Sequence, residues 1–296
     1  MPLSLAAIAA INGDVDALRE AIDLYPNTAN SQTMGDYGGE DEEEAHDLVV
    51  IGGTPLHHLI CADTEPPRDE DDYRRRVPKL HSAQNHELRR AHVVCAKMLL
   101  AGGLEVDALD HQDRSHLVLA VLARRPKLVA LLLEAGADVS ALQAIHFEDD
   151  VRWGLLHLAQ AAEVPDDVGV QRDVYEIVTS LVAAGASSTT SHEYYGTPLE
   201  YAVWMNQRRL RSYFFRLGAA FPRPPHLMPA PQFTRTCYAP RRRDPHLLKI
   251  EAAGSFQNYE CAHLRSLSAT FVPKFPRLPA ELVPLIVRFW AHVGDY

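Results

Sequence analysis

The sequence predicts an all-α protein built from about five helix-turn-helix repeats and followed by a helical C-terminal segment. The first observation is a period: Gly103 and Gly136 lie 33 residues apart, and Gly185 and Gly218 repeat that interval. The second is that each of these glycines comes at the end of a run of apolar residues. Glycine commonly ends a helix because it adopts the left-handed conformation without a Cβ clash. We therefore expect each glycine to close the second helix of one repeat.

A helix-start signal precedes each of these helices and predicts a shorter first helix. Residues 54–57 read Thr-Pro-Leu-His and residues 197–200 read Thr-Pro-Leu-Glu, which combines an N-cap residue with Pro at the first helical position. Ser115 and Gly154 stand at the corresponding places between them. The five predicted units span approximately residues 3–30, 53–109, 112–145, 152–190 and 194–221.

These phased start and end signals resemble the ankyrin repeat, whose signature joins a Thr-Pro-Leu-His helix start to a Leu-Leu-x-x-Gly-Ala helix end. Residues 54–57 match the start in full, and residues 132–137 match the end. The resemblance covers residues 1–221 and implies an ankyrin-repeat solenoid, in which each repeat buries its apolar face on its neighbours. It also implies that His57 and His157 bond the backbone near the helix starts.

Several segments depart from the repeat. The first connector, residues 31–52, is enlarged and acidic, residues 63–90 are inserted between the two helices of the second unit, and a smaller insertion lies near residues 163–172. Charge and Pro or Gly with few apolar residues predict surface loops. After the repeats, residues 222–245 are rich in Pro and predict a strap or linker. Residues 246–296 then predict one or two helices with a break near Gly254, followed by a last helix.

The formal charge of −10 is unevenly distributed along the chain. Residues 222–296 carry ten Lys or Arg and five Asp or Glu, which leaves −15 on residues 1–221. An acidic repeat region argues against nucleic-acid binding, since phosphate contacts need clustered cations. No apolar stretch is long enough to span a bilayer, and the four cysteines show no paired spacing. We expect an intracellular, cytoplasmic monomer without a membrane partner, with the nucleus as the alternative compartment.

The motifs of common enzyme classes are missing. The sequence contains no glycine-rich phosphate loop, no nucleophile elbow and no His-Glu-x-x-His zinc motif. Among its fifteen histidines, His81, His86 and His92 lie at spacings of five and six, which do not place them on one helical face. We therefore expect no catalytic activity, no cofactor and no metal site.

The resemblance to ankyrin repeats implies where a protein partner binds. In that family the connector tips and the exposed end of the first helix line a concave groove, so we expect a non-enzymatic scaffold that binds a protein of unknown identity. Trp153 and Trp204 are the strongest anchors, because Trp is enriched among the residues that dominate interface energetics. The alternative is that one or both of them pack between adjacent repeats. The candidate groove residues are His111, Gln112, Arg114, Leu122, Asp150, Trp153, His192, Glu193, Tyr194, Trp204 and Met205.

The end of the chain is apolar on nearly every helical face over residues 278–290, so it must be covered by the fold or by a partner. It resembles the start of an F-box, in which Leu-Pro-x-Glu-Leu precedes an Ile and then an aromatic residue. This implies docking on the adaptor of a cullin ubiquitin ligase, although Pro284 would interrupt a continuous helix. The alternative is a helix that caps the fifth repeat. The candidate adaptor-binding residues are Leu278, Pro279, Leu282, Ile286, Phe289 and Trp290.

Overall fold

The computed structural model describes residues 4–32, 53–62, 86–140, 142–144, 152–161, 168–192, 195–222, 245–279 and 281–290. The contacts within the chain define two compact units, Met1–Ser187 and Ser188–Tyr296. Most of the acidic connector, of the insertion in the second repeat and of the Pro-rich segment lies outside the described residues, as do Asp150, Glu193 and Tyr194.

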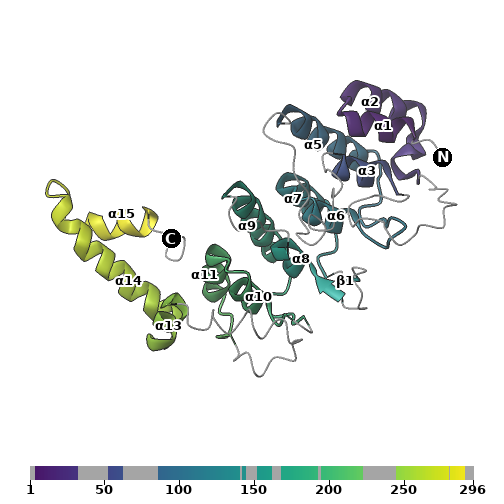
Figure 1. Cartoon of the computed structure of the whole chain (residues 1–296). Helices are drawn as coiled ribbons and strands as arrows, with labels where there is room; N and C mark the ends of the chain where they lie inside the picture. Colours follow the sequence, from purple (N-terminus) through teal and green to yellow (C-terminus); the bar gives the residue numbers. More distant parts are fainter. Residues whose placement is uncertain are drawn as a thin grey trace, which may run out of the picture. The chain divides into compact units, whose positions relative to one another are not determined.

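The first unit consists, in its described residues, of four helix pairs (Figure 1). The pairs are α1 (Leu5–Asn12) with α2 (Val15–Leu24), α3 (Pro55–Cys61) with α5 (His86–Ala101), α6 (His116–Leu122) with α7 (Pro126–Glu134), and α8 (Leu155–Ala161) with α9 (Val168–Ala183). A 3-10 helix, η1 (Pro26–Asn30), follows α2, and an antiparallel hairpin of β1 (Leu142–Ala144) and β2 (Arg152–Gly154) precedes α8. Residues 86–90, which we expected in the insertion, instead form the first turn of α5.

The helices of the first unit form two layers. The first helices pack in the order α1, α3, α6 and α8, and the second helices pack in the order α2, α5, α7 and α9. A helix inside the stack is covered on several sides, which is why residues 116–121 of α6 are all buried. The all-α repeat of the ankyrin type is thus confirmed. No helix in the described part of the chain has both the length and the apolarity to cross a membrane.

The predicted helix ends share one backbone geometry. Gly103, Gly136, Gly185 and Gly218 have φ values of +86°, +90°, +103° and +82°. At Gly136, its N–H donates to the carbonyl of Leu133 at 3.1 Å, and the next N–H donates to the carbonyl of Leu132 at 3.0 Å. The other three glycines make the same pair of bonds. These are Schellman motifs, which confirm that glycine closes each second helix.

The predicted helix starts are also confirmed. Thr197 accepts a hydrogen bond from the backbone of Glu200 at 3.3 Å, and the Glu200 carboxylate accepts one from the Thr197 N–H at 2.8 Å. This reciprocal pair is a capping box. Ser115 caps α6 by accepting from the Val118 N–H at 3.4 Å.

The second unit begins with the fifth helix pair, α10 (Pro198–Trp204) and α11 (Arg208–Arg216). The C-terminal helices follow as α13 (Pro245–Ala252), α14 (Phe256–Phe271), a 3-10 helix η5 (Val272–Lys274) and α15 (Leu282–Trp290) (Figure 1). The expected break falls at Gly254, which has a φ of +76°. Helix α15 packs on α14, where Val283 and Val287 contact Leu264, Leu267 and Phe271.

Candidate protein-binding site

A buried polar network joins the second and third repeats and fixes the connector between them. The Thr54 hydroxyl donates to Nε2 of His116 at 2.7 Å, and Nδ1 of His116 donates to the Val106 carbonyl at 2.8 Å. His57 accepts from the Thr54 N–H at 3.1 Å and donates to the Arg114 carbonyl at 3.2 Å. His57 therefore bonds the backbone at the helix start, as predicted. His157 is buried at the start of α8.

Both imidazoles of this network are neutral because the site excludes water. Burial, reinforced by the neighbouring His116, lowers the pKa of His57 to about 2. Burial also lowers the pKa of His116 to about 4, against the opposing effect of its bond to the Val106 carbonyl. In each ring one nitrogen donates and the other accepts, which is the arrangement of a neutral imidazole.

The connector tip of the third repeat is held from within by an ion pair. Oδ2 of Asp110 accepts from Nε of Arg114 at 2.8 Å and lies 2.7 Å from Nη2, and both residues are buried. Oδ1 accepts from the backbone N–H groups of Gln112 and Arg114, each at 2.9 Å. We expected Arg114 to line the groove, but its side chain is buried inside the connector tip, where it pairs with Asp110. His111 remains exposed and Gln112 half-buried, so these two side chains are accessible.

Trp153 does not present its ring to solvent. It lies on β2, where it pairs with Gln143 of β1, and its exposed fraction is 5%. Strand β2 leads directly into the buried first turn of α8, which places Trp153 among packed residues. Trp153 therefore packs inside the fold, as in the alternative prediction, and does not anchor a partner in the groove. Leu122, at the end of α6, is half-buried.

The connector before α10 buries another expected groove residue. His192 has an exposed fraction of 4% and forms a reciprocal backbone bridge with Gly196 at 2.8 and 3.0 Å. Nδ1 of His192 accepts from the Tyr195 N–H at 3.3 Å. Burial lowers the pKa of His192 to about 4, so its ring is neutral and fixes the turn.

Tyr195, Tyr201 and Trp204 form an aromatic cluster in the second unit. The ring centroid of Tyr195 lies 5.1 Å from Tyr201 and 5.2 Å from Trp204, and those of Tyr201 and Trp204 lie 5.5 Å apart. Tyr201 is buried, whereas Tyr195 and Trp204 are half-buried. Met205, which follows α10, is half-buried as well. We expected Tyr194, and not Tyr195, to be a contact residue, although the two tyrosines are adjacent in the sequence.

The C-terminal helix has two apolar faces with different environments. Val283 and Val287 are buried against α14, whereas Leu282, Leu285 and Ile286 have exposed fractions of 44%, 62% and 45%. Pro284 lies in the first turn, where a missing N–H costs little.

The remaining adaptor-binding candidates flank this exposed face. Leu278 and Pro279 are exposed before the helix. Phe289 and Trp290 end α15, and their side chains lie outside the described residues. Leu278, Leu282 and Ile286 therefore remain accessible in the second unit.

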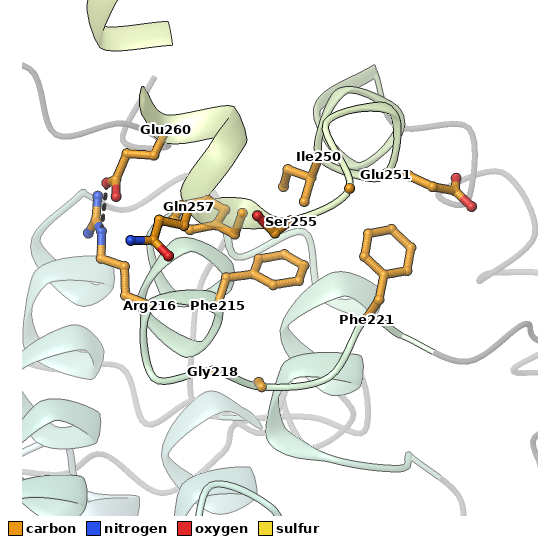
Figure 2. Close-up of a pocket in the computed structure, with 12 residues that line it drawn as sticks. Phe215, Arg216, Gly218, Phe221, Ile250, Glu251, Ser255, Gln257 and Glu260 are labelled. Atoms are coloured by element: carbon orange, nitrogen blue, oxygen red, sulfur yellow. Dashed lines mark hydrogen bonds and ion pairs between the residues drawn. The ribbon is translucent and has the colours of Figure 1, made fainter. Parts of the chain in front are cut away.

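The C-terminal helices are attached to the fifth repeat through α14 (Figure 2). The ring of Phe215 on α11 stacks on Phe256 at 5.3 Å with an interplanar angle of 8°. Beside this stack, Nε of Arg216 donates to Glu260 at 3.0 Å, which is the dashed bond in Figure 2. A cavity of about 680 Å³ lies beside this stack and is lined by α11, α13, α14 and the residues that follow α11. No three His, Cys, Asp or Glu side chains within the described ranges are arranged to hold a metal ion.

Comparisons with known proteins match only parts of the chain. No protein-family model matches it. Over 43 residues it is 54% identical to protein lin-12 of Caenorhabditis elegans, and this segment is 14% of the chain but only 3% of lin-12. The crystal structure of the human ASB11 ankyrin repeat domain is 20% identical, with a TM-score of 0.46, over 74% of this chain and 71% of that one. The description as an ankyrin-type repeat rests on the helix starts, helix ends and layers described above.

Proposed function

We propose that the protein is a non-enzymatic module that binds a protein partner through the aromatic cluster of its second unit. The observation that supports this is the half-buried Trp204, which sits at an expected contact position and is held by two tyrosine rings. Tyr and Trp dominate interface energetics because each contributes a large area at a small cost in conformational entropy.

The contacts of the cluster make Trp204 a suitable anchor. Tyr201 is buried under it, and Tyr195 lies against it from the connector. A side chain that is fixed before binding loses less entropy when the partner arrives. The indole nitrogen of Trp204 is buried and has no hydrogen-bond partner within the described chain, so the ring, and not its N–H, offers the contact area. A partner therefore meets a preorganised surface formed by Trp204, Tyr195 and Met205.

We expect Trp204→Ala to weaken partner binding at least tenfold, because truncating an interface anchor removes about 2 kcal/mol or more. Proximity labelling in the native host would supply partners, and calorimetric titration of a purified partner would give the Kd. Met205→Ala tests the same face with a smaller change. Tyr25→Ala, an exposed aromatic at the end of α2, is the matched control. Equal affinity of the wild type and the folded Trp204 and Met205 variants would contradict the proposal.

A second candidate function is recruitment of a cullin ubiquitin ligase through α15. The observation that favours it is that Leu278, Leu282 and Ile286, which carry the F-box resemblance, are exposed while other residues of α15 attach the helix to α14. A helix that buries one apolar face and leaves another exposed is suited to docking in a groove. In this function the aromatic cluster captures the client and α15 captures the ligase adaptor.

We expect a purified complex of the adaptor with its cullin to be retained by the immobilised chain, and Leu282→Asp with Ile286→Asp to abolish retention. The physical reason is that a carboxylate buried in an apolar interface without a counter-charge is strongly unfavourable. Leu248→Asp changes an equally exposed leucine on α13 and should have no effect. Failure of the wild-type chain to retain the complex, or retention that the double substitution leaves unchanged, would remove this candidate.

A further inference from the structure

Six cationic side chains of the first unit converge on one cavity of about 410 Å³. The cavity has three walls. They are formed by α5, by α9, and by the turn between α6 and α7 together with the start of α7. The cations are Arg89, Arg90, Arg124, Arg125, Lys127 and Arg172. Residues 1–221 carry a net charge of −15, so this gathering of positive charge opposes the surrounding field. Like charges held close together repel, and a bound anion relieves that repulsion.

Two of these arginines build the cavity. Arg125 bonds Nδ1 of His92 at 2.9 Å and the Ile60 carbonyl at 3.4 Å. Nε2 of His92 in turn donates to the Ile11 carbonyl at 2.8 Å, so this chain of bonds ties three repeats together. Arg124 is buried, with the backbone in the left-handed region at a φ of +51°. This conformation turns the chain sharply from α6 into α7.

Three of the other four cations are accessible to a ligand, whereas Arg89 is half-buried. Arg90 on α5 and Lys127 on α7 are exposed, and the side chain of Arg172 on α9 has an exposed fraction of 67%. These three residues come from three walls of the cavity. The N-terminus of α7 opens into the same space, and no side chain in the described ranges caps it. The first amides of this helix add partial positive charge there.

The interior of the cavity is partly dehydrated. Burial raises the pKa of Asp173, although the charges of Arg172, Arg89 and Arg124 act to lower it. Desolvation, together with the repulsion of the neighbouring Glu176, therefore outweighs the three guanidinium groups in setting the pKa of this carboxyl. In such an environment the attraction between fixed cations and a ligand anion is stronger than on an open surface. The carboxylates of Asp173 and Glu176 lie 3.7 and 3.9 Å from the guanidinium of Arg172, and their remaining lone pairs can accept from hydroxyl groups.

We propose that this cavity binds a polyphosphorylated polyol of the inositol phosphate class, a function separate from the protein-binding face. Cations on three walls can neutralise more than one phosphate group. None of the described residues that line the cavity is aromatic, so a nucleotide base has no ring on which to stack. The two carboxylates instead match the free hydroxyl groups of a polyol. The volume lies in the range of small-ligand sites.

Calorimetric titration of the chain of 296 residues with inositol 1,4,5-trisphosphate, which carries both phosphate groups and free hydroxyl groups, at about 0.15 M ionic strength, tests the proposal. We expect saturable binding of one ligand per chain, with ATP at least tenfold weaker. The same chemistry also occurs as a lipid headgroup. Sedimentation with phosphatidylcholine vesicles, with and without phosphatidylinositol bisphosphate, separates the two sources. If the chain sediments only with vesicles that contain the phosphorylated lipid, the ligand is the lipid headgroup. If it binds the inositol phosphate in the calorimeter but does not sediment with these vesicles, the ligand is the free inositol phosphate.

Substitutions distinguish this cavity from general surface attraction. Arg90→Gln and Arg172→Gln should each raise the Kd about tenfold, since each removes a charge-assisted contact. Asp173→Asn should lower the Kd, because the amide keeps an acceptor oxygen for a hydroxyl group and removes a negative charge that repels the phosphate groups. Lys97→Gln removes an exposed cation from the same helix as Arg90 but outside the cavity, and should leave the Kd unchanged. Unaltered melting temperatures would show that the variants fold.

Three results would overturn the proposal. The first is the absence of saturable binding of inositol 1,4,5-trisphosphate to the wild-type chain. The second is an ATP affinity equal to that of the inositol phosphate, since this would show that the polyol contributes nothing. The third is a Lys97→Gln variant that weakens binding as much as Arg90→Gln, because binding would then follow the net charge of the chain and not the cavity.

Discussion

Asp110→Ala is expected to lower the free energy of unfolding of the first unit by about 3 kcal/mol. At the connector tip of the third repeat the carboxylate accepts hydrogen bonds from two backbone N–H groups and from Nε of Arg114, and it forms an ion pair with Nη2 of Arg114 at 2.7 Å. Both side chains are buried. The substitution removes the counter-charge of a buried cation and leaves two amides without their acceptor. Either loss alone is costly in a site that excludes water.

Denaturant unfolding followed by circular dichroism measures this effect. Asp16→Ala is the matched control, because that carboxylate is exposed and its ion pair with Arg19 at 3.4 Å should contribute little. Combining Asp110→Leu with Arg114→Met should recover part of the lost stability by removing the uncompensated charge. If Asp110→Ala changed the unfolding free energy no more than Asp16→Ala, the ion pair would not hold the tip.

The helix boundaries could be predicted because their signals are local. A glycine that ends a helix adopts a positive φ wherever the repeat places it, and a Thr or Ser before Pro-Leu or His-Leu caps the helix that follows. The 33-residue spacing of such signals is enough to predict the helix pairs. Layer packing then follows, because each pair has one apolar face that needs a neighbour.

The candidate site could be predicted only in part, because the exposure of each side chain depends on neighbours that are distant in the sequence. Arg114 has the type of side chain that lines a binding surface, but the buried Asp110 holds it and His57 of the preceding repeat bonds its carbonyl. The cation-lined cavity was missed for the same reason. Arg90 and Arg172 are 82 residues apart in a region of negative net charge, and only the stacking of α5, α7 and α9 brings them together.

Acidification from pH 7.5 to pH 5 is expected to lower the free energy of unfolding by about 4 kcal/mol through His57 and His116. In the folded chain the pKa of His57 is lowered to about 2 and that of His116 to about 4, mainly by burial. Both rings therefore stay neutral at pH 5 when folded, whereas in the unfolded chain they bind protons below about pH 6.5. Because the unfolded state then binds more protons, stability falls as the pH falls, by about 2 kcal/mol for each ring.

Denaturant unfolding at several pH values between 7.5 and 5 measures this dependence above the range in which most carboxylates titrate. His116→Gln keeps a donor and an acceptor near Val106 and Thr54 but cannot be protonated, so it should reduce the loss by about 2 kcal/mol. His111→Gln replaces an exposed imidazole of the neighbouring tip and should retain the wild-type dependence. A pH dependence that His116→Gln leaves unchanged would show that the buried pair does not account for it. His116→Gln can also lower the free energy of unfolding at every pH, but a purely structural loss would lower it by the same amount at each pH. A change in the slope of this free energy against pH therefore identifies the titration of His116.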